Sequence, residues 1–274
     1  MITSFSNASS LSAIRTLSNL NDDIAATENR ISTTRKINSA KDNGAVWSIA
    51  QKMRSSVTAL DSVTSSLARG KGIVDMATTA TETVSDLLGQ MKAIALAATD
   101  SGLNNADRTA LNDQFTALRD QIGSVVSGAT VGGVNMISGA GTSINPLASE
   151  SGSTVVVAGQ SLAYGGANVT IAANASFNNA AQASALVTQL STSIDNVTLV
   201  AAKLGTGSNA LDTQMTFVSK LQDTLEVATG RLVDADMGKE SAKLAALKTQ
   251  QELAAQVLSM ANARPSLLLQ LFKN

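Results

Sequence analysis

A heptad pattern of apolar residues extends from Val46 to Ala98, and no other feature constrains the fold of this chain as strongly. Thirteen of its sixteen a and d positions are apolar, whereas a chain that is 44% hydrophobic would fill about seven by chance. Such spacing places one continuous apolar stripe on a helix. The pattern predicts a single helix of about 80 Å with a buried seam along it.

A second helical pattern lies in the other half of the chain. Apolar residues recur at helical spacing from Leu186 to Leu204. Four more extend the pattern in steps of seven: Leu211, Val218, Leu225 and Leu232. Gly205 and Gly207 interrupt it, and each glycine costs about 1 kcal/mol relative to Ala inside a helix. Two helices with a break and one strained helix both agree with these residues.

Three further helices are predicted around these two. An apolar stripe over residues 17–31 predicts the first, and a run from about Asn104 to Val126 predicts another that folds back on the long helix. The last is expected over Ala242–Ala261 and to end at Pro265. Ser39 and Asp42 have capping-box spacing, which predicts that the long helix starts near Ser39 or Ala40.

The middle of the chain changes to turn chemistry. Glycines and Pro146 punctuate residues 128–146 and end helical structure. Short strands are predicted over Thr154–Ala158 and Asn168–Ala172, with a third around Leu162. The fold class is therefore mainly α, a long antiparallel coiled-coil helical bundle with a small β-hairpin region in the middle.

Composition argues against catalysis and against several kinds of partner. The chain contains no cysteine and no histidine, which removes thiol nucleophiles, imidazole bases and the usual zinc or copper ligands. The acidic pairs Asp42 with Asp61 and Asp234 with Asp236 have no supporting residues for acid-base or metal chemistry. We expect no enzyme activity, no metal and no cofactor.

Charge and hydropathy exclude two more partners. The 20 basic and 21 acidic residues give a net charge of −1 and are spread along the chain, so no basic field is expected for nucleic acid. Charged residues interrupt every long apolar run, and the N-terminus lacks the pattern of a cleaved signal peptide. We expect neither nucleic-acid nor membrane binding.

Sequence segments at both ends resemble bacterial flagellins. Arg30-Ile31-Ser32-Thr33, the stretch from Ile37 to Asp42, and Ile49-Ala50 are similar to the N-terminal flagellin signature. Leu258 to Asn262, with Pro265 and Leu271-Phe272, are similar to the flagellin ending. The short middle makes the chain most similar to the compact, Caulobacter-type flagellins of alphaproteobacteria, which lack large outer variable domains.

This resemblance implies a division into named layers. Residues 1–36 and 235–274 would form paired terminal helices called D0, and residues 37–43 a linking spoke. Residues 44–138 and 180–234 would form the helical bundle D1, and residues 139–179 a short β-hairpin and outer variable segment. It also implies one continuous helix across Gly205 and Gly207.

The resemblance assigns residues to these layers. Polymerisation through D0 would use apolar side chains: Ile14, Leu17, Leu20, Ile24, Ile31, Leu244, Leu247, Leu258, Leu268, Leu271 and Phe272. The spoke would comprise Ile37, Asn38, Ser39, Ala40, Lys41 and Asp42. The D1 core would comprise Ile49, Met53, Leu60, Val63, Leu67, Val74, Leu88, Met91, Leu111, Phe115, Leu118, Ile122, Leu211, Val218, Leu225 and Leu232.

Two segments depart from the family pattern. Thr34-Arg35 stands where relatives usually have Gly-Leu. The segment that the mammalian innate receptor contacts in enteric flagellins has also diverged, and its positions here are Gln90, Lys92, Ala93 and Ile94. Because Gln90 and Ala93 replace an arginine and a glutamate, weak or absent receptor activation is expected.

The implied function is a self-assembling subunit of the extracellular flagellar filament used for swimming. Its expected partners are further copies of itself, other flagellins of the cell, hook-associated and cap proteins, the flagellar type III export apparatus and an export chaperone. The chain would be exported unfolded, and the lack of cysteine suits that route. Two alternatives are a hook-filament junction protein, which shares the paired terminal helices, and a coiled-coil signalling module.

Overall fold

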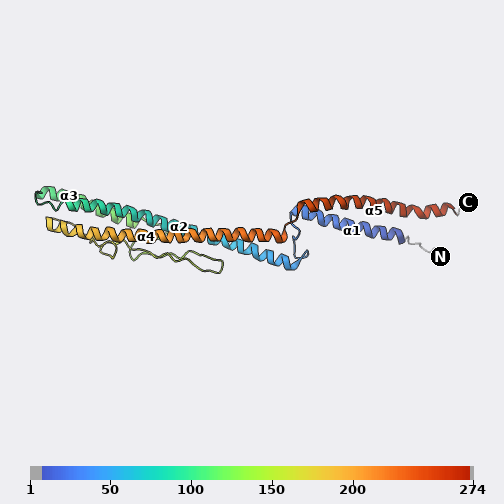
Figure 1. Cartoon of the computed structure of the whole chain (residues 1–274), viewed down its shortest axis with the longest axis horizontal. Helices are drawn as coiled ribbons and strands as arrows, with labels where there is room; N and C mark the ends of the chain where they lie inside the picture. Colours follow the sequence, from blue (N-terminus) through green and yellow to red (C-terminus); the bar gives the residue numbers. More distant parts are fainter. Residues whose placement is uncertain (1–7, 272–274) are drawn as a thin grey trace. The chain divides into compact units, whose positions relative to one another are not determined.

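The computed structural model describes the backbone of residues 8–271 and the side chains of residues 10–263. Five helices account for most of it: α1 (Ala8–Thr33), α2 (Gly44–Ala97), α3 (Asn105–Gly128), α4 (Ala180–Val233) and α5 (Met237–Leu271) (Figure 1). The mainly α fold predicted from the sequence is confirmed. The chain divides into two compact units inside α2 and α4: unit 1 is residues 1–55 with 224–274, and unit 2 is residues 56–223.

In unit 1, α1 and α5 lie side by side (Figure 1). Ile24, Thr27 and Leu247 are buried in their seam, which is the apolar stripe predicted over residues 17–31. Polar contacts flank it: the Arg30 guanidinium lies 3.8 Å from the Glu240 carboxylate, and the Gln251 side chain donates to Asn21 at 2.6 Å. The two helices therefore form an antiparallel pair with a narrow apolar seam, which we call the terminal hairpin.

The segment after α1 pairs with the connection between α4 and α5. The Lys36 amide donates to the Val233 carbonyl at 2.7 Å, and the Ala235 amide donates to the Thr34 carbonyl at 2.9 Å. Thr34 has φ 56, a left-handed conformation that favours glycine. This pairing holds the connection from α1 to α2 against the connection from α4 to α5.

The long helix starts later than the predicted Ser39 or Ala40. Helix α2 begins at Gly44, and the Asn43 side-chain oxygen accepts the Val46 amide at 3.1 Å. Asp42 instead accepts the Ser39 amide at 2.9 Å and so closes a turn in front of the helix. The capping-box spacing is real, but its carboxylate bonds back to the turn and Asn43 caps the helix.

Unit 2 packs α3 and the outer parts of α2 and α4 around one apolar core (Figure 1). Ten of the residues predicted for the D1 core are buried: Leu60, Val63, Leu67, Val74, Leu88, Met91, Phe115, Ile122, Leu211 and Val218. Phe115 meets Phe177 edge to face with ring centroids 5.4 Å apart. This aromatic contact joins α3 to the segment that precedes α4.

Ile49 does not lie in a core, because its side chain is 50% exposed and the next residue, Ala50, is buried instead. An ideal helix drifts by about 20° per heptad relative to a strict seven-residue repeat, so a long pattern does not follow one face to its end. The remaining predicted core residues are half-buried: Met53, Leu111, Leu118, Leu225 and Leu232.

Helix α4 is continuous across Gly205 and Gly207. A Cβ at Gly207 would lie 2.6 Å from Cγ1 of Val157, whereas a Cβ at Gly205 would meet open space. Gly70 on α2 has the same role as Gly207, because a Cβ there would overlap Pro146. Two helical glycines thus let the middle of the chain approach α2 and α4 closely.

Residues 144–157 form a hairpin that we call the hairpin arm. Ile144 and Val157 exchange backbone hydrogen bonds of 3.0 Å, and Leu147 pairs with Thr154. The arm is fixed to both long helices, because the Leu147 amide donates to Ser66 of α2 at 3.1 Å and Gln214 of α4 donates to the Ala148 carbonyl at 2.7 Å.

The β-hairpin region thus exists without continuous strands in the described part of the chain, since all its pairs are isolated bridges. Within the predicted second strand, over residues 168–172, only Val169 forms such a pair, with Tyr164. Side-chain contacts with the helices, more than strand pairing, hold this region in place.

The ends of the other helices partly match the prediction. Asn104 caps α3 through its side-chain oxygen, which accepts the Asp107 amide at 2.8 Å, as the predicted start near Asn104 implies. The last helix was expected over Ala242–Ala261, but α5 begins at Met237 and its backbone continues across Pro265. A proline removes one N–H donor, and here the flanking turns continue the helix past it.

Candidate functional site

The hairpin of α1 and α5 brings most of the predicted D0 residues into one seam. Ile24 and Leu247 are buried there. Five others are half-buried along it: Leu17, Leu20, Ile31, Leu244 and Leu258. Ile14 is 49% exposed. The side chains of Leu268 and Leu271, and the whole of Phe272, lie outside the described residues.

A second apolar stripe lies on the outer surface of α5. Leu253, Val257 and Met260 follow one another at i, i+4 and i+7 and are 56%, 51% and 62% exposed. Residues at these spacings share a helix face, so the three form one continuous surface. Sequence reasoning missed this stripe because α5 is rich in Ala and Leu on every side, although the spacing of the three residues was visible.

The predicted spoke residues, Ile37 to Asp42, form a compact turn. The Asp42 carboxylate accepts the amides of Ser39 and Asn38, each at 2.9 Å. These bonds, with that to Ser39 the stronger influence, hold the pKa of Asp42 below its ordinary value. A charged Asp42 therefore stabilises the turn between α1 and α2.

A polar network joins α2 to α4 in unit 2. The Lys71 ammonium lies 2.8 Å from the Asp212 carboxylate and 3.2 Å from the Ser208 hydroxyl, which in turn donates to Asp75 at 3.0 Å. The hydrogen bond to Asp212 raises the pKa of Lys71. The network is a cross-link between helices, and its side chains face one another.

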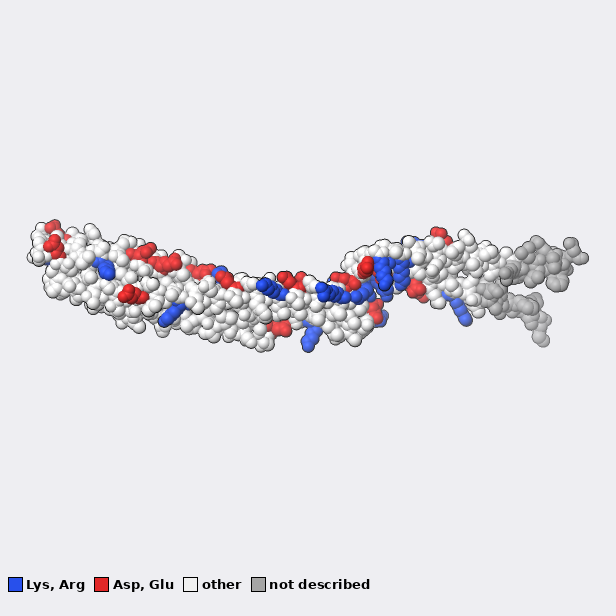
Figure 2. Space-filling model, in the orientation of Figure 1, with Lys and Arg blue, Asp and Glu red and all other residues white. Residues whose placement is uncertain are grey.

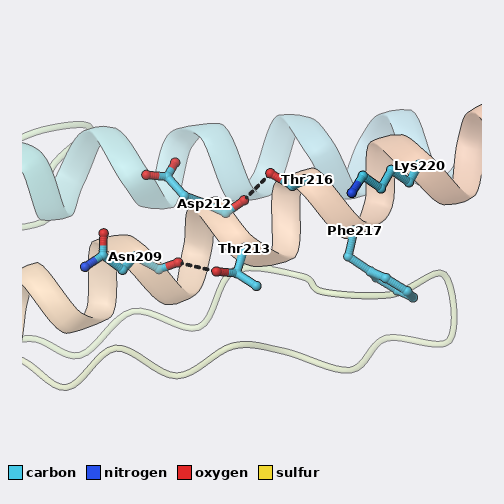
Figure 3. Close-up of a pocket in the computed structure, with 6 residues that line it drawn as sticks. All are labelled: Asn209, Asp212, Thr213, Thr216, Phe217 and Lys220. Atoms are coloured by element: carbon cyan, nitrogen blue, oxygen red, sulfur yellow. Dashed lines mark hydrogen bonds between the residues drawn. The ribbon is translucent and has the colours of Figure 1, made fainter.

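One groove on the surface of α4 is lined by six residues of that helix: Asn209, Asp212, Thr213, Thr216, Phe217 and Lys220 (Figure 3). The hydroxyls of Thr213 and Thr216 donate to carbonyls one turn earlier in α4, so they are engaged within the helix. Phe217 is 57% exposed, so the lining of the groove includes an apolar ring. The groove offers surface for packing and no nucleophile with a base.

The described residues form neither a metal site nor a membrane-spanning helix. No group of three or more His, Cys, Asp and Glu side chains in residues 10–263 is placed to hold a metal ion. Among the described helices, none has a stretch sufficiently long and apolar to cross a bilayer.

The segment for which the resemblance implies a diverged receptor contact lies on α2. Gln90 and Ala93 are exposed on the helix, and Lys92 and Ile94 are half-buried. Gln90 and Ala93 are therefore surface positions in this chain.

Family comparisons cover most of the chain. Residues 5–142 match the bacterial flagellin N-terminal helical region, and residues 187–272 match the bacterial flagellin C-terminal helical region. The segment between the two matches, residues 143–186, contains the whole hairpin arm and the first residues of α4. Both matched regions include one helix of the terminal hairpin and one long helix of the bundle.

Full-length relatives agree with these matches. Flagellin FljM of Caulobacter vibrioides is 43% identical, with 97% of each chain covered. A flagellin of Brucella melitensis is 34% identical over the whole of both chains. A solved structure from Vibrio parahaemolyticus, named for the flagellar hook-associated class, is similar in fold, with a TM-score of 0.60, 18% identity, and 70% of this chain and all of that chain covered.

Proposed function

This chain belongs to the bacterial flagellin family, and we propose that it is a structural subunit that assembles with copies of itself into the flagellar filament. The family matches span both ends of the chain, and the relatives named flagellin cover nearly its whole length. Its role is mechanical, because packed helices must transmit force between repeated subunits. No enzyme activity forms part of the proposal.

The observation that carries the assembly mechanism is the exposed apolar stripe of Leu253, Val257 and Met260. In a single copy this surface faces water, although α5 already buries Leu247 against α1. Exposed contiguous apolar surface marks an interaction site. We infer that α1 and α5 pair within each copy through one face and contact neighbouring copies through the other.

The division into layers is part of the same proposal. Residues 1–36 and 235–274 act as D0, residues 37–43 as the spoke, and residues 44–138 with 180–234 as D1. Residues 139–179 serve as the outer segment, which in this chain is folded along α2 and α4. The subunit would reach the extracellular filament by export through the flagellar pathway, with an export chaperone and cap and hook-associated proteins as partners.

Electron microscopy of the purified protein after salt-induced assembly tests the function. Long tubes are expected. Discrete monomers or dimers under every condition would contradict it. Removal of residues 1–36 or 235–274 should abolish tube formation, while circular dichroism should still show a folded bundle. Tubes of normal length from either truncation would contradict the role of the terminal hairpin.

The two alternative functions have less support. Likeness to the hook-associated structure concerns the fold alone, since the sequences are 18% identical. The relatives that match over the whole chain are named flagellins, which favours the filament over a junction. A coiled-coil signalling module finds no support in these comparisons.

We further propose that the monomer activates the mammalian flagellin receptor weakly or not at all. The support is the exposure of Gln90 and Ala93, where enteric flagellins present an arginine and a glutamate. A reporter cell for that receptor, treated with purified monomer, should give little signal. Restoring Arg and Glu at the two positions should raise it, and a strong signal from the unchanged monomer would contradict this proposal.

A further inference from the structure

Charge is unevenly divided between the two units of this chain, contrary to the even spread expected from the sequence. Unit 1 contains 13 Lys and Arg against 9 Asp and Glu, a net charge of +4. Unit 2 contains 7 Lys and Arg against 12 Asp and Glu, a net charge of −5. The overall charge of −1 therefore conceals two parts of opposite sign.

The positive charge of unit 1 is concentrated in residues 30–54 and 231–248, which we call the basic collar. These residues contain ten Lys and Arg against four Asp and Glu. Figure 2 shows their blue side chains gathered in this part of unit 1. Seven of the ten are exposed: Lys36, Lys41, Lys52, Arg231, Lys239, Lys243 and Lys248.

The few carboxylates of the basic collar are mostly used within it. Asp42 accepts the amides of Asn38 and Ser39, and Asp236 accepts the Lys239 amide at the start of α5. Glu240 lies 3.8 Å from Arg30 in the seam between α1 and α5. These contacts engage three of the four carboxylates with groups of the basic collar itself, while Lys239 and Lys243 lie exposed one turn apart on α5.

The negative charge of unit 2 is densest in residues 75–120, which we call the acidic stretch. It contains seven Asp and Glu against three Lys and Arg. Two of those three face carbonyls of their own unit, since Arg108 donates to Ala98 and Asp100, and Arg119 donates to Ala175. On α2, Asp75, Glu82 and Asp86 are exposed at i, i+7 and i+11, which is one face of the helix.

We propose that the basic collar of one subunit binds the acidic stretch of a neighbouring copy in the filament. The inference rests on the proposed function, because assembly places many identical copies in contact. The occupant follows from charge complementarity, since this chain itself supplies a stretch of opposite sign, with a net charge of −4 against +6 in the basic collar. At physiological ionic strength charges interact over only about 8 Å, so the two surfaces must be in contact for the pairing to matter.

Complementary charge of this kind sets register and association rate more than raw affinity. A regular rotation and shift between copies would bring the same collar onto the same acidic stretch at every repeat. The pairing would also disfavour collar-to-collar contact, because like charges repel there. It thus gives a homopolymer a preferred direction of addition.

A charge-swap experiment on full-length protein tests the proposal. The collar variant K239E/K243E and the acidic variant E82K/D86K should each raise the critical concentration for tube formation about tenfold at low NaCl concentration. The combined four-residue variant has the net charge of the natural chain, and it should assemble at close to the natural critical concentration. Circular dichroism of each monomer checks that the helices form.

Two matched controls separate contact from net charge. K203E/K220E changes the net charge as much as the collar variant does, but on α4 of unit 2, and should assemble better than the collar variant. Combining K203E/K220E with E82K/D86K restores the net charge of the chain but not the complementary surfaces. This combined variant should therefore not recover normal assembly.

The possible outcomes are distinguishable. Absence of tubes from the natural chain would refute the filament function itself. Tubes from the natural chain and equally from both single-surface variants, or no recovery in the combined variant, would overturn the charge pairing alone. Normal tubes from the collar variant, together with loss of binding to anionic phospholipid vesicles that the natural monomer binds, would assign the collar to a membrane surface and also overturn it.

Discussion

Thr34 occupies a backbone conformation that its side chain disfavours. Its φ of 56 lies in the left-handed region, which costs a non-glycine residue about 1 to 2 kcal/mol. Replacement by glycine removes that cost but increases the entropy of the unfolded chain. We expect Thr34→Gly to stabilise the folded chain by about 0.5 to 1 kcal/mol.

Thermal unfolding of the monomer, followed by circular dichroism, measures this effect. Thr33→Gly is the matched control, because Thr33 ends α1 with a helical conformation. Its replacement by glycine should destabilise the folded chain. A lower melting temperature for Thr34→Gly than for the natural chain would contradict the predicted strain.

Asp42 makes the spoke turn sensitive to acid. Its pKa is lowered chiefly by the Ser39 amide and then by the Asn38 amide, so the charged form is favoured in the folded chain. The stabilisation is present above the ordinary aspartate pKa and is lost as the pH falls through the lower folded value. Amide exchange at Asn38 and Ser39 should therefore accelerate only in that acid window, relative to amides elsewhere in unit 1.

The variant Asp42→Asn supplies the comparison for this prediction. An amide oxygen is a weaker acceptor than a carboxylate, so exchange at Ser39 should be faster at neutral pH and should show no further transition in acid. The same acid transition in both proteins would show that another group is responsible.

Local sequence signals located some residue roles and missed others. Asn104 was predicted to start α3 because an Asn before a helical run is a strong cap signal, and it does so. The same reasoning misplaced the start of α2 near Ser39 or Ala40, because the Ser39 and Asp42 pair closes a turn and Asn43 caps the helix. The conformation of Thr34 could be suspected only by comparison with relatives.

Among the elements, α4 depends on Gly207 for close packing and does not depend on Gly205. Gly207→Ala would place a Cβ 2.6 Å from Val157, a buried and β-branched side chain that has little freedom to move. We expect a loss of about 1 to 3 kcal/mol in unfolding free energy from overpacking. Gly205→Ala meets open space and should gain up to about 1 kcal/mol from helix propensity.

Chemical denaturation of the pair of variants tests this assignment. The double variant Gly207→Ala with Val157→Ala should recover part of the loss, because the smaller side chain makes room for the new Cβ. Equal stability of Gly205→Ala and Gly207→Ala would show that the hairpin arm does not pack on α4 as described.

Periodicity could predict the helices because each of them buries one face over many turns. The hairpin arm is different, because its course depends on Gly70, Gly207, Ser66 and Gln214, which are distant in sequence. A single sequence contains no direct signal for such contacts. The same limit explains why the sequence left a break in α4 open: Gly205 and Gly207 lower its helix propensity, and the packing role of Gly207 is visible only in three dimensions.

At the scale of the whole molecule, the exposed stripe of α5 separates assembly from folding. Replacing Leu253 and Val257 with Asp should prevent tube formation or raise its critical concentration at least tenfold, since both side chains are more than half exposed in one copy. Helix content and thermal stability of the monomer should change little. Electron microscopy and sedimentation measure the first effect, and circular dichroism the second.

Leu247→Asp is the contrasting variant, because that residue is buried between α1 and α5. It should lower the stability of the terminal hairpin as well as assembly, since it buries a charge. Normal tubes from the Leu253 and Val257 variant would mean that another surface carries the contacts between copies.

The assembly surface was only half predictable from the sequence. Amphipathicity marks the most apolar stripe on each terminal helix, and that stripe is buried where α1 contacts α5. The face that remains exposed for contact with other copies can be recognised only once the contact between α1 and α5 is known. Charge asymmetry was likewise hidden, because unit 1 combines the two ends of the chain, which are far apart in the sequence.

The closed end of the hairpin arm makes this subunit suitable for display of a foreign peptide. The Ala148 amide donates to the Ser153 carbonyl across the turn, Gly152 has φ 88, and the side chains from Glu150 to Thr154 are exposed. A short epitope or dye-binding tag inserted after Ser151 would leave Pro146 and Val157 on their glycines. Each copy would then present one label, so the label density of a polymer would report its subunit number.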